Sequence, residues 1–75
     1  MKRVKLFENS EGRFETFFKG EHYSTLTCGN RLYLFDEDDV LCPGRVEHNN
    51  YGYYWICDDG LQIEYLRNGI YGYVE

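Results

Sequence analysis

The sequence predicts an all-β protein: a small antiparallel β-barrel or strongly bent sheet, SH3-like in character, with six or seven short strands. Three observations favour this class. The chain has no alanine but eight tyrosines and five phenylalanines, and aromatic and β-branched side chains suit the half-buried surface of a sheet. Its eight glycines fall between apolar runs, as turn residues do. No window shows a sustained apolar period of 3.6 residues, so no helix is expected.

Length and charge narrow the class further. The 75 residues allow one small domain, residues 1–75. Eight Lys and Arg against 13 Asp and Glu leave a net charge of −5, which argues against nucleic-acid binding. No apolar run approaches the ~20 residues that span a bilayer, and the N-terminal stretch lacks the apolar core of a signal peptide. We therefore expect a cytoplasmic protein with no membrane partner.

The strands are punctuated by turn residues. The clearest strands are expected at residues 2–8, 13–18, 31–35 and 53–58, with shorter ones near 23–27 and 45–48. Residues 36–44 form the longest predicted connection, which holds an acidic run and the single proline, Pro43.

The C-terminal third predicts a three-strand meander. Asp59-Gly60 and Asn68-Gly69 are typical of two-residue type I′ turns, which set the register of their hairpins. The first turn places Tyr54 opposite Tyr65 and Ile56 opposite Ile63. The second pairs the last strand with the one before it.

Alternation along these strands separates two faces. The face assigned to the core carries Tyr54, Ile56, Leu61, Ile63, Tyr65, Ile70, Gly72 and Val74. The opposite face carries Tyr53, Trp55, Cys57, Gln62, Glu64, Leu66, Tyr71 and Tyr73. The second set mixes aromatic rings with polar groups, which is typical neither of a core nor of a solvated face.

Two interpretations of this aromatic face stay open. In the first, the N-terminal hairpin folds over it and completes a second small core, using Val4, Leu6, Phe7, Phe14, Phe17 and Phe18. In the second, the face is open and binds a protein, because aromatic side chains supply contact area at low entropic cost. The partner-binding residues would then be Tyr53, Trp55, Glu64, Tyr71 and Tyr73, with Asp36, Asp38 and Asp39 as an acidic rim. Weak self-association through the same face is a third option.

No catalytic, metal or cofactor site is expected. Cys28, Cys42 and Cys57 are 14 and 15 residues apart, without the close pairs that structural zinc sites use. The acidic run fails as a calcium loop because Leu41 stands where the turn requires glycine. Nothing in the sequence brings a histidine to a cysteine, so the chain is predicted not to be an enzyme.

Short motifs also recur in a familiar order. They are Gly12-Arg13-Phe14-Glu15, Leu26-Thr27-Cys28-Gly29-Asn30, Gly44-Arg45-Val46-Glu47, Tyr53-Tyr54-Trp55 and Leu66-Arg67-Asn68-Gly69-Ile70. In this the chain resembles a family of short bacterial proteins known only as a domain of unknown function and often encoded on phages and other mobile elements. The resemblance implies a small β-barrel without catalytic residues, and small acidic proteins of such elements are often interaction proteins.

The predicted function is therefore a non-enzymatic, protein-binding module of bacterial or mobile-element origin, whose aromatic face and acidic rim suit a basic partner. The alternative is an acidic inhibitor that mimics nucleic acid and occupies the nucleic-acid site of a host protein.

Overall fold

The computed structural model describes residues 1–75 and shows one open antiparallel sheet of eight strands with no helix. The strands are β1 (Lys2–Glu8), β2 (Phe14–Phe18), β3 (Glu21–Thr25), β4 (Arg31–Phe35), β5 (Leu41–Asn49), β6 (Gly52–Cys57), β7 (Ile63–Tyr65) and β8 (Tyr71–Val74). Their order across the sheet is β3-β2-β1-β8-β4-β5-β6-β7, so β3 and β7 are the edges. The all-β prediction is confirmed, with one or two strands more than expected. No helix is present that is long and apolar enough to cross a membrane.

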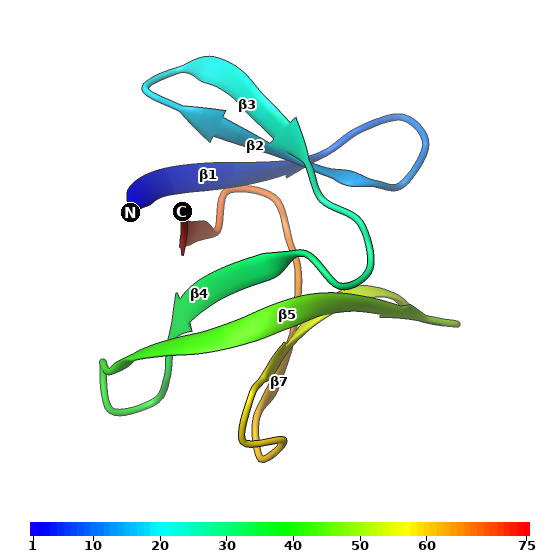
Figure 1. Cartoon of the computed structure of the whole chain (residues 1–75). Coiled ribbons are helices and arrows are strands. Elements are labelled where there is room, and N and C mark those ends of the chain that lie inside the picture. Colours follow the sequence, from blue (N-terminus) through cyan, green and yellow to red (C-terminus); the bar gives the residue numbers. More distant parts are fainter.

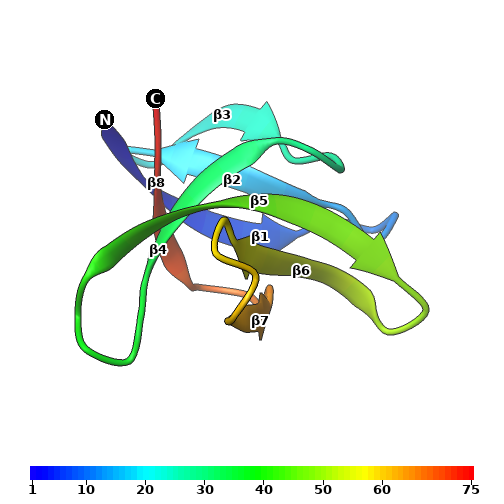
Figure 2. The same ribbon diagram turned by 60° about the horizontal axis from the view of Figure 1, so that its bottom comes forward.

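The sheet bends until its two halves face each other. In Figures 1 and 2, β1 and β2 lie across from β5, and the two chain ends lie side by side. The ends meet because β8 sits between β1 and β4, with Lys2 opposite Val74. One core cluster fills the space between the halves, drawn from both ends of the chain: Val4, Leu6, Phe14, Leu26, Leu32, Leu34, Val46, Trp55, Cys57, Leu66 and Val74.

Strand β5 is longer than predicted. It begins at Leu41, so the connection expected at residues 36–44 is only a short turn. Pro43 lies inside the strand, opposite Tyr33 of β4. Its carbonyl accepts a hydrogen bond of 3.0 Å from the N–H of Asp58, just beyond the end of β6. Pro43 therefore lies at the end of the β5–β6 ladder, where the lack of an N–H interrupts no hydrogen bond inside the ladder.

The register of the β6–β7 hairpin is confirmed, since Tyr54 pairs with Tyr65 and Ile56 pairs with Ile63. The predicted turn type is wrong. A type I′ turn needs positive φ at both central residues, and only Gly60 (φ 74°) has it. The N–H of Gly60 instead bonds the carbonyl of Cys57, and the side chain of Asp59 accepts from the N–H of Leu61.

The third strand of the predicted C-terminal meander does not pair with β7. The N–H of Gly69 bonds the carbonyl of Leu6 at 2.7 Å, and the N–H of Leu6 bonds the carbonyl of Ile70 at 2.9 Å. Residues 69–70 therefore bond to the end of β1, and the strand that follows them, β8, lies between β1 and β4. The turn residues Asn68-Gly69 favour pairing with β7, which would give the last strand one partner. In its observed place the last strand has hydrogen-bonding partners on both sides, β1 and β4.

The predicted core face of β6 and β7 is also wrong. Trp55 is completely buried, whereas Ile63 is 55% exposed. The two sets of alternating residues on β6 and β7 were predicted correctly, but the set assigned to the core faces outward and the other set faces the core. The N-terminal hairpin covers this face, as the first interpretation expected, but Val4, Leu6 and Phe14 join Trp55 in one core and do not form a second one. Phe7 and Phe17 lie outside that core, and Phe7 is 40% exposed.

The indole of Trp55 holds three strands together. Its ring N–H donates a buried hydrogen bond of 2.7 Å to the carbonyl of Leu32 on β4, reaching across β5. The ring lies directly over Gly44 of β5, and a Cβ at that position would overlap it. Gly44 does not have a left-handed backbone, so its backbone conformation does not require glycine. The close approach of the Trp55 ring does.

Two aliphatic truncations test this assignment of faces. Leu32→Ala should lower the free energy of unfolding by about 2–5 kcal/mol, because Leu32 is fully buried in the core. Ile63→Ala should lower it by less than about 1 kcal/mol, because the side chain is largely in water. Urea denaturation followed by tryptophan fluorescence measures both. Equal losses would show that the outer face of β7 is buried in solution.

Candidate functional site

The residues predicted to form one aromatic patch lie on opposite faces of the sheet. Trp55 is in the core, and half-buried Tyr53 packs against the core. Tyr71 and Tyr73 lie on the outer face of β8, beside Lys5 and Arg3 of β1. The predicted row of aromatic side chains therefore does not exist, because β8 is not the neighbour of β7.

Glu64 is separate from the outer-face tyrosines as well. Its side chain is 30% exposed and pairs with Arg67, with an Oε1–Nη1 distance of 3.0 Å. It therefore sits in a local ion pair at the edge of the sheet and not at the centre of an aromatic surface.

The predicted acidic rim is the β4–β5 turn. Asp36 closes this turn, since one of its carboxylate oxygens accepts hydrogen bonds from the N–H groups of Val40 and Asp38. These bonds, that from Val40 foremost, lower the pKa of the Asp36 carboxyl. Asp38 and Asp39 are exposed. Asp36 is thus a structural residue, and the free carboxylates of the rim are its neighbours.

The Asp36 hydrogen bonds predict a pH dependence of stability. A lowered folded-state pKa stabilises the fold above the unfolded value near 4, and the contribution is lost as the pH falls through the folded value. Asp36→Asn should therefore be less stable than the parent at neutral pH, and the difference should close below about pH 4. Asp38→Asn is the control, because the Asp38 side chain accepts no hydrogen bond. A gap for Asp36→Asn that is constant from neutral pH to pH ~2 would contradict this assignment.

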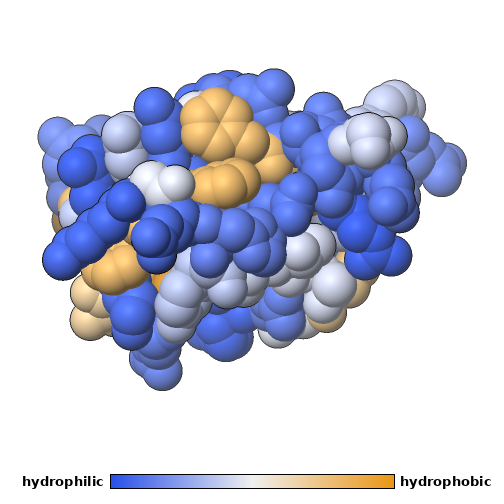
Figure 3. Space-filling view, turned by 90° about the horizontal axis from the view of Figure 1, so that it is seen from above, coloured by the Kyte–Doolittle hydropathy of each residue, from blue (hydrophilic) through white to orange (hydrophobic).

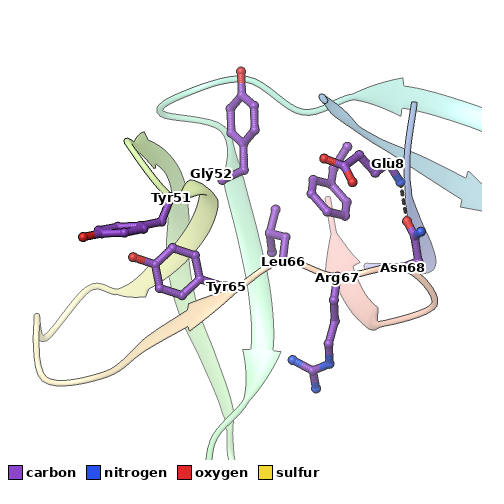
Figure 4. A pocket seen from close by; sticks show the side chains of 9 residues that line it. Glu8, Tyr51, Gly52, Tyr65, Leu66, Arg67 and Asn68 are labelled. Carbon is purple, nitrogen blue, oxygen red and sulfur yellow. Dashed lines mark hydrogen bonds between the residues drawn. The ribbon is translucent and has the colours of Figure 1, made fainter. Parts of the chain in front are cut away.

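A hollow of about 720 Å³ lies on the open side of the bent sheet. Figure 4 shows the rings of Tyr51 and Tyr65 on one side of it and Glu8 with Asn68 on the other. The Asn68 side chain accepts a hydrogen bond of 2.6 Å from the N–H of Glu8, which joins the end of β1 to the segment before β8. Every buried side-chain polar atom of the chain has a hydrogen-bond partner.

The outer face of β6, β7 and the turn between them is apolar. Leu61, Ile63 and Tyr65 are exposed there, and Tyr54 and Ile56 are half-buried beside them. The rings of Tyr54 and Tyr65 lie 5.7 Å apart, and Ile63 is more than half exposed. These residues were assigned to the core from the sequence, and their exposure makes them candidates for binding.

A second candidate surface lies on the other half of the sheet. Arg3, Lys5, Phe7, Phe17, Lys19, Gly20 and Tyr71 line a hollow of about 620 Å³ and are called the aromatic–cationic face below. Figure 3 looks down on the β1–β3 side and shows a compact cluster of hydrophobic side chains in a mostly hydrophilic surface. Tyr71 is the only member of this set that was predicted from the sequence to bind a partner. The available signal was the alternation of Arg3, Lys5 and Phe7 with the buried Val4 and Leu6.

The structure offers no assembled nucleophile or metal-binding group. No three His, Cys, Asp or Glu side chains lie close enough to hold a metal ion. Cys57 is buried, and burial, with Asp36 nearby, raises the pKa of the Cys42 thiol to about 11. That thiol is therefore protonated at neutral pH and is a poor nucleophile.

Fold and surfaces together define a small all-β domain with an exposed apolar edge at β7 and an exposed hollow lined by aromatic and cationic side chains. The comparison with protein families places it: residues 4–70 match the family described as a domain of unknown function, DUF5348, and the chain belongs to that family. The search of curated proteins and the search of solved structures each found no match.

Proposed function

We propose that this domain is a non-enzymatic, protein-binding module that adds an extended segment of a partner protein to the free edge of β7. The observation that carries the proposal is an unpaired strand edge next to exposed apolar side chains. Such an edge supplies backbone hydrogen bonds for affinity and side-chain contacts for specificity.

The free backbone groups of β7 can be located from its ladder. Gln62 and Leu66 bond to β6 through their backbone groups, at 3.0 and 3.1 Å. Partners alternate along an antiparallel pair, so the N–H and C=O groups of Ile63 and Tyr65 point away from β6. Two residues with both groups free give up to four hydrogen bonds to an added strand.

The two edges of the sheet differ in the apolar side chains that they present. β3 begins with the charged Glu21, and a charged side chain on an edge discourages pairing with other chains. β7 has one carboxylate, Glu64, which pairs with Arg67, and it presents the exposed Ile63 and Tyr65 beside Ile56 and Tyr54 of β6. Such exposed apolar surface is unusual unless something binds it.

The neighbourhood of β7 indicates the kind of segment that fits. The hollow in Figure 4 begins where β7 ends, since Tyr65 and Leu66 line it. A strand added to β7 would pass this hollow and place one large apolar side chain in it. The net charge of −5 favours encounter with a basic segment.

A partner segment is a better occupant than a second copy of the chain. Antiparallel pairing of two β7 strands about a two-fold axis at Glu64 would place the two carboxylates opposite each other. Mimicry of nucleic acid is less well supported, because Asp36 is engaged in its turn and only the other acidic residues of that turn are free.

Selection of random peptides on the immobilised domain, followed by measured affinities, tests the proposal. We expect extended sequences with alternating apolar residues and added Lys or Arg. Ile63→Pro removes one outward N–H without touching the ladder to β6, and should weaken binding about tenfold or more. Ile63→Thr is the matched control, since it keeps the N–H and should cost less.

Peptides that bind Ile63→Pro as tightly as the parent would refute the edge proposal. A second measurement does not depend on how the variant folds. N-methylation of alternate residues of a selected peptide should abolish binding in one register and spare it in the other. Equal sensitivity in both registers would exclude strand addition.

A further inference from the structure

The aromatic–cationic face concentrates positive charge in an acidic chain. Arg3, Lys5 and Lys19 line its hollow together with aromatic residues and Gly20, and no carboxylate lines it. Of the eight Lys and Arg side chains only Arg31, Arg45 and Arg67 form ion pairs. The three cations of the hollow are therefore uncompensated, although the chain as a whole carries a charge of −5.

The same hollow presents flat aromatic surfaces on the sheet. The rings of Phe7 and Phe17 meet edge to face at 5.9 Å. The guanidinium of Arg3 lies 3.9 Å from the centre of the Tyr71 ring, and the Lys5 ammonium lies 5.3 Å from it. Tyr71 is 46% exposed. Rings and a planar guanidinium thus alternate with ammonium groups on one open surface.

A ligand for this face must offer flat apolar rings and negative charge together. An acidic peptide satisfies the cations but leaves the aromatic rings without partners. Duplex nucleic acid has the charge but hides its base faces in the stack. A single strand supplies both, because unstacked bases stack on aromatic rings and on arginine while phosphates meet the cations. We propose that the aromatic–cationic face binds single-stranded nucleic acid.

The backbone at Lys19 supports a role for its side chain. Lys19 (φ 53°) and Gly20 (φ 83°) form the two-residue turn between β2 and β3, with Phe18 opposite Glu21. Positive φ at the first position favours Asn, Asp or Gly, and lysine adopts it with strain. The strained position carries a lysine that lines the hollow, with its ammonium 5.3 Å from the centre of the adjacent Phe18 ring, although Asn would fit the turn with less strain.

The expectation of no nucleic-acid binding depended on the net charge of −5. Glu64 is not among the residues of this face. The neighbouring carboxylate on this side of the sheet is Glu15, opposite Phe7, and it contacts His22 at 2.9 Å and does not line the hollow. Charges more than about 8 Å away are largely screened at physiological salt.

Fluorescence anisotropy with a labelled oligothymidylate of about ten nucleotides tests the proposal. Binding by the intact domain should weaken with salt, with a slope of log affinity against log salt near −2 for three phosphate contacts. Tyr71→Ser should weaken binding about tenfold. Tyr23→Ser is its control, because Tyr23 is 42% exposed and lies outside the hollow.

A second pair of variants separates local charge from net charge. Lys5→Gln and Arg45→Gln each remove one positive charge, but Arg45 lies on β5, three strands from β1, and pairs with Glu47. Only Lys5→Gln should weaken binding. No binding at low salt, equal losses in each matched pair, or equal affinity for duplex DNA would overturn the proposal. So would full competition by polyglutamate, which would assign the face to an acidic protein.

Lys19→Asn makes a combined prediction. It should raise the midpoint of urea denaturation by relieving the turn, and should lower the salt slope of oligothymidylate binding by about 0.7 by removing one phosphate contact. A variant that is more stable and binds with an unchanged slope would show that Lys19 has no part in the site.

Discussion

The fit of the Trp55 indole over Gly44 is the constraint on which the rest of the structure depends. The ring occupies the space where any side chain at position 44 would lie, and its N–H reaches past β5 to the carbonyl of Leu32. Three strands are thereby held at close range around one buried ring. The same closeness recurs at Gly72, where a Cβ would meet the side chains of Leu32 and Leu34 at 2.9 Å. Gly44 and Gly72 thus let core side chains approach the backbone closely on the concave side of the bent sheet.

This packing decides which side of β6 faces inward, and alternation alone could not. Both faces of the strand carry apolar or aromatic residues, so a period of two predicted the two sets correctly and left their placement open. The deciding signal lies in the neighbouring strand. Across the β5–β6 hairpin, Trp55 stands beside Val46, while Ile56 stands beside Arg45. The charged Arg45 marks the outer face of β6, and this signal becomes readable once the pairing of β5 with β6 is known.

The misplaced last strand has a different physical origin. Turn residues encode local pairing, and the β6–β7 register could be predicted because its two strands are separated by a few residues. β8 instead pairs with β1, at the opposite end of the chain, and with β4. The hydrogen bonds between Leu6 and residues 69–70 form only after the two ends of the sequence meet. The predicted aromatic patch depended on this strand. Because β8 pairs with β1 and not with β7, Tyr71 and Tyr73 lie on the outer face, away from Trp55 in the core.

The two proposed surfaces occupy opposite parts of the sheet and differ in character. Between β1 and β6 lie β8, β4 and β5, a separation of about 19 Å along the sheet. The bend keeps these outer faces apart, because the core lies on the concave side. A segment added at the β7 edge extends the sheet away from β6, and a strand bound over Tyr71 lies on β1 and β8. Neither ligand occupies the residues of the other, so a domain with both activities would hold a protein segment and a single nucleic-acid strand at the same time.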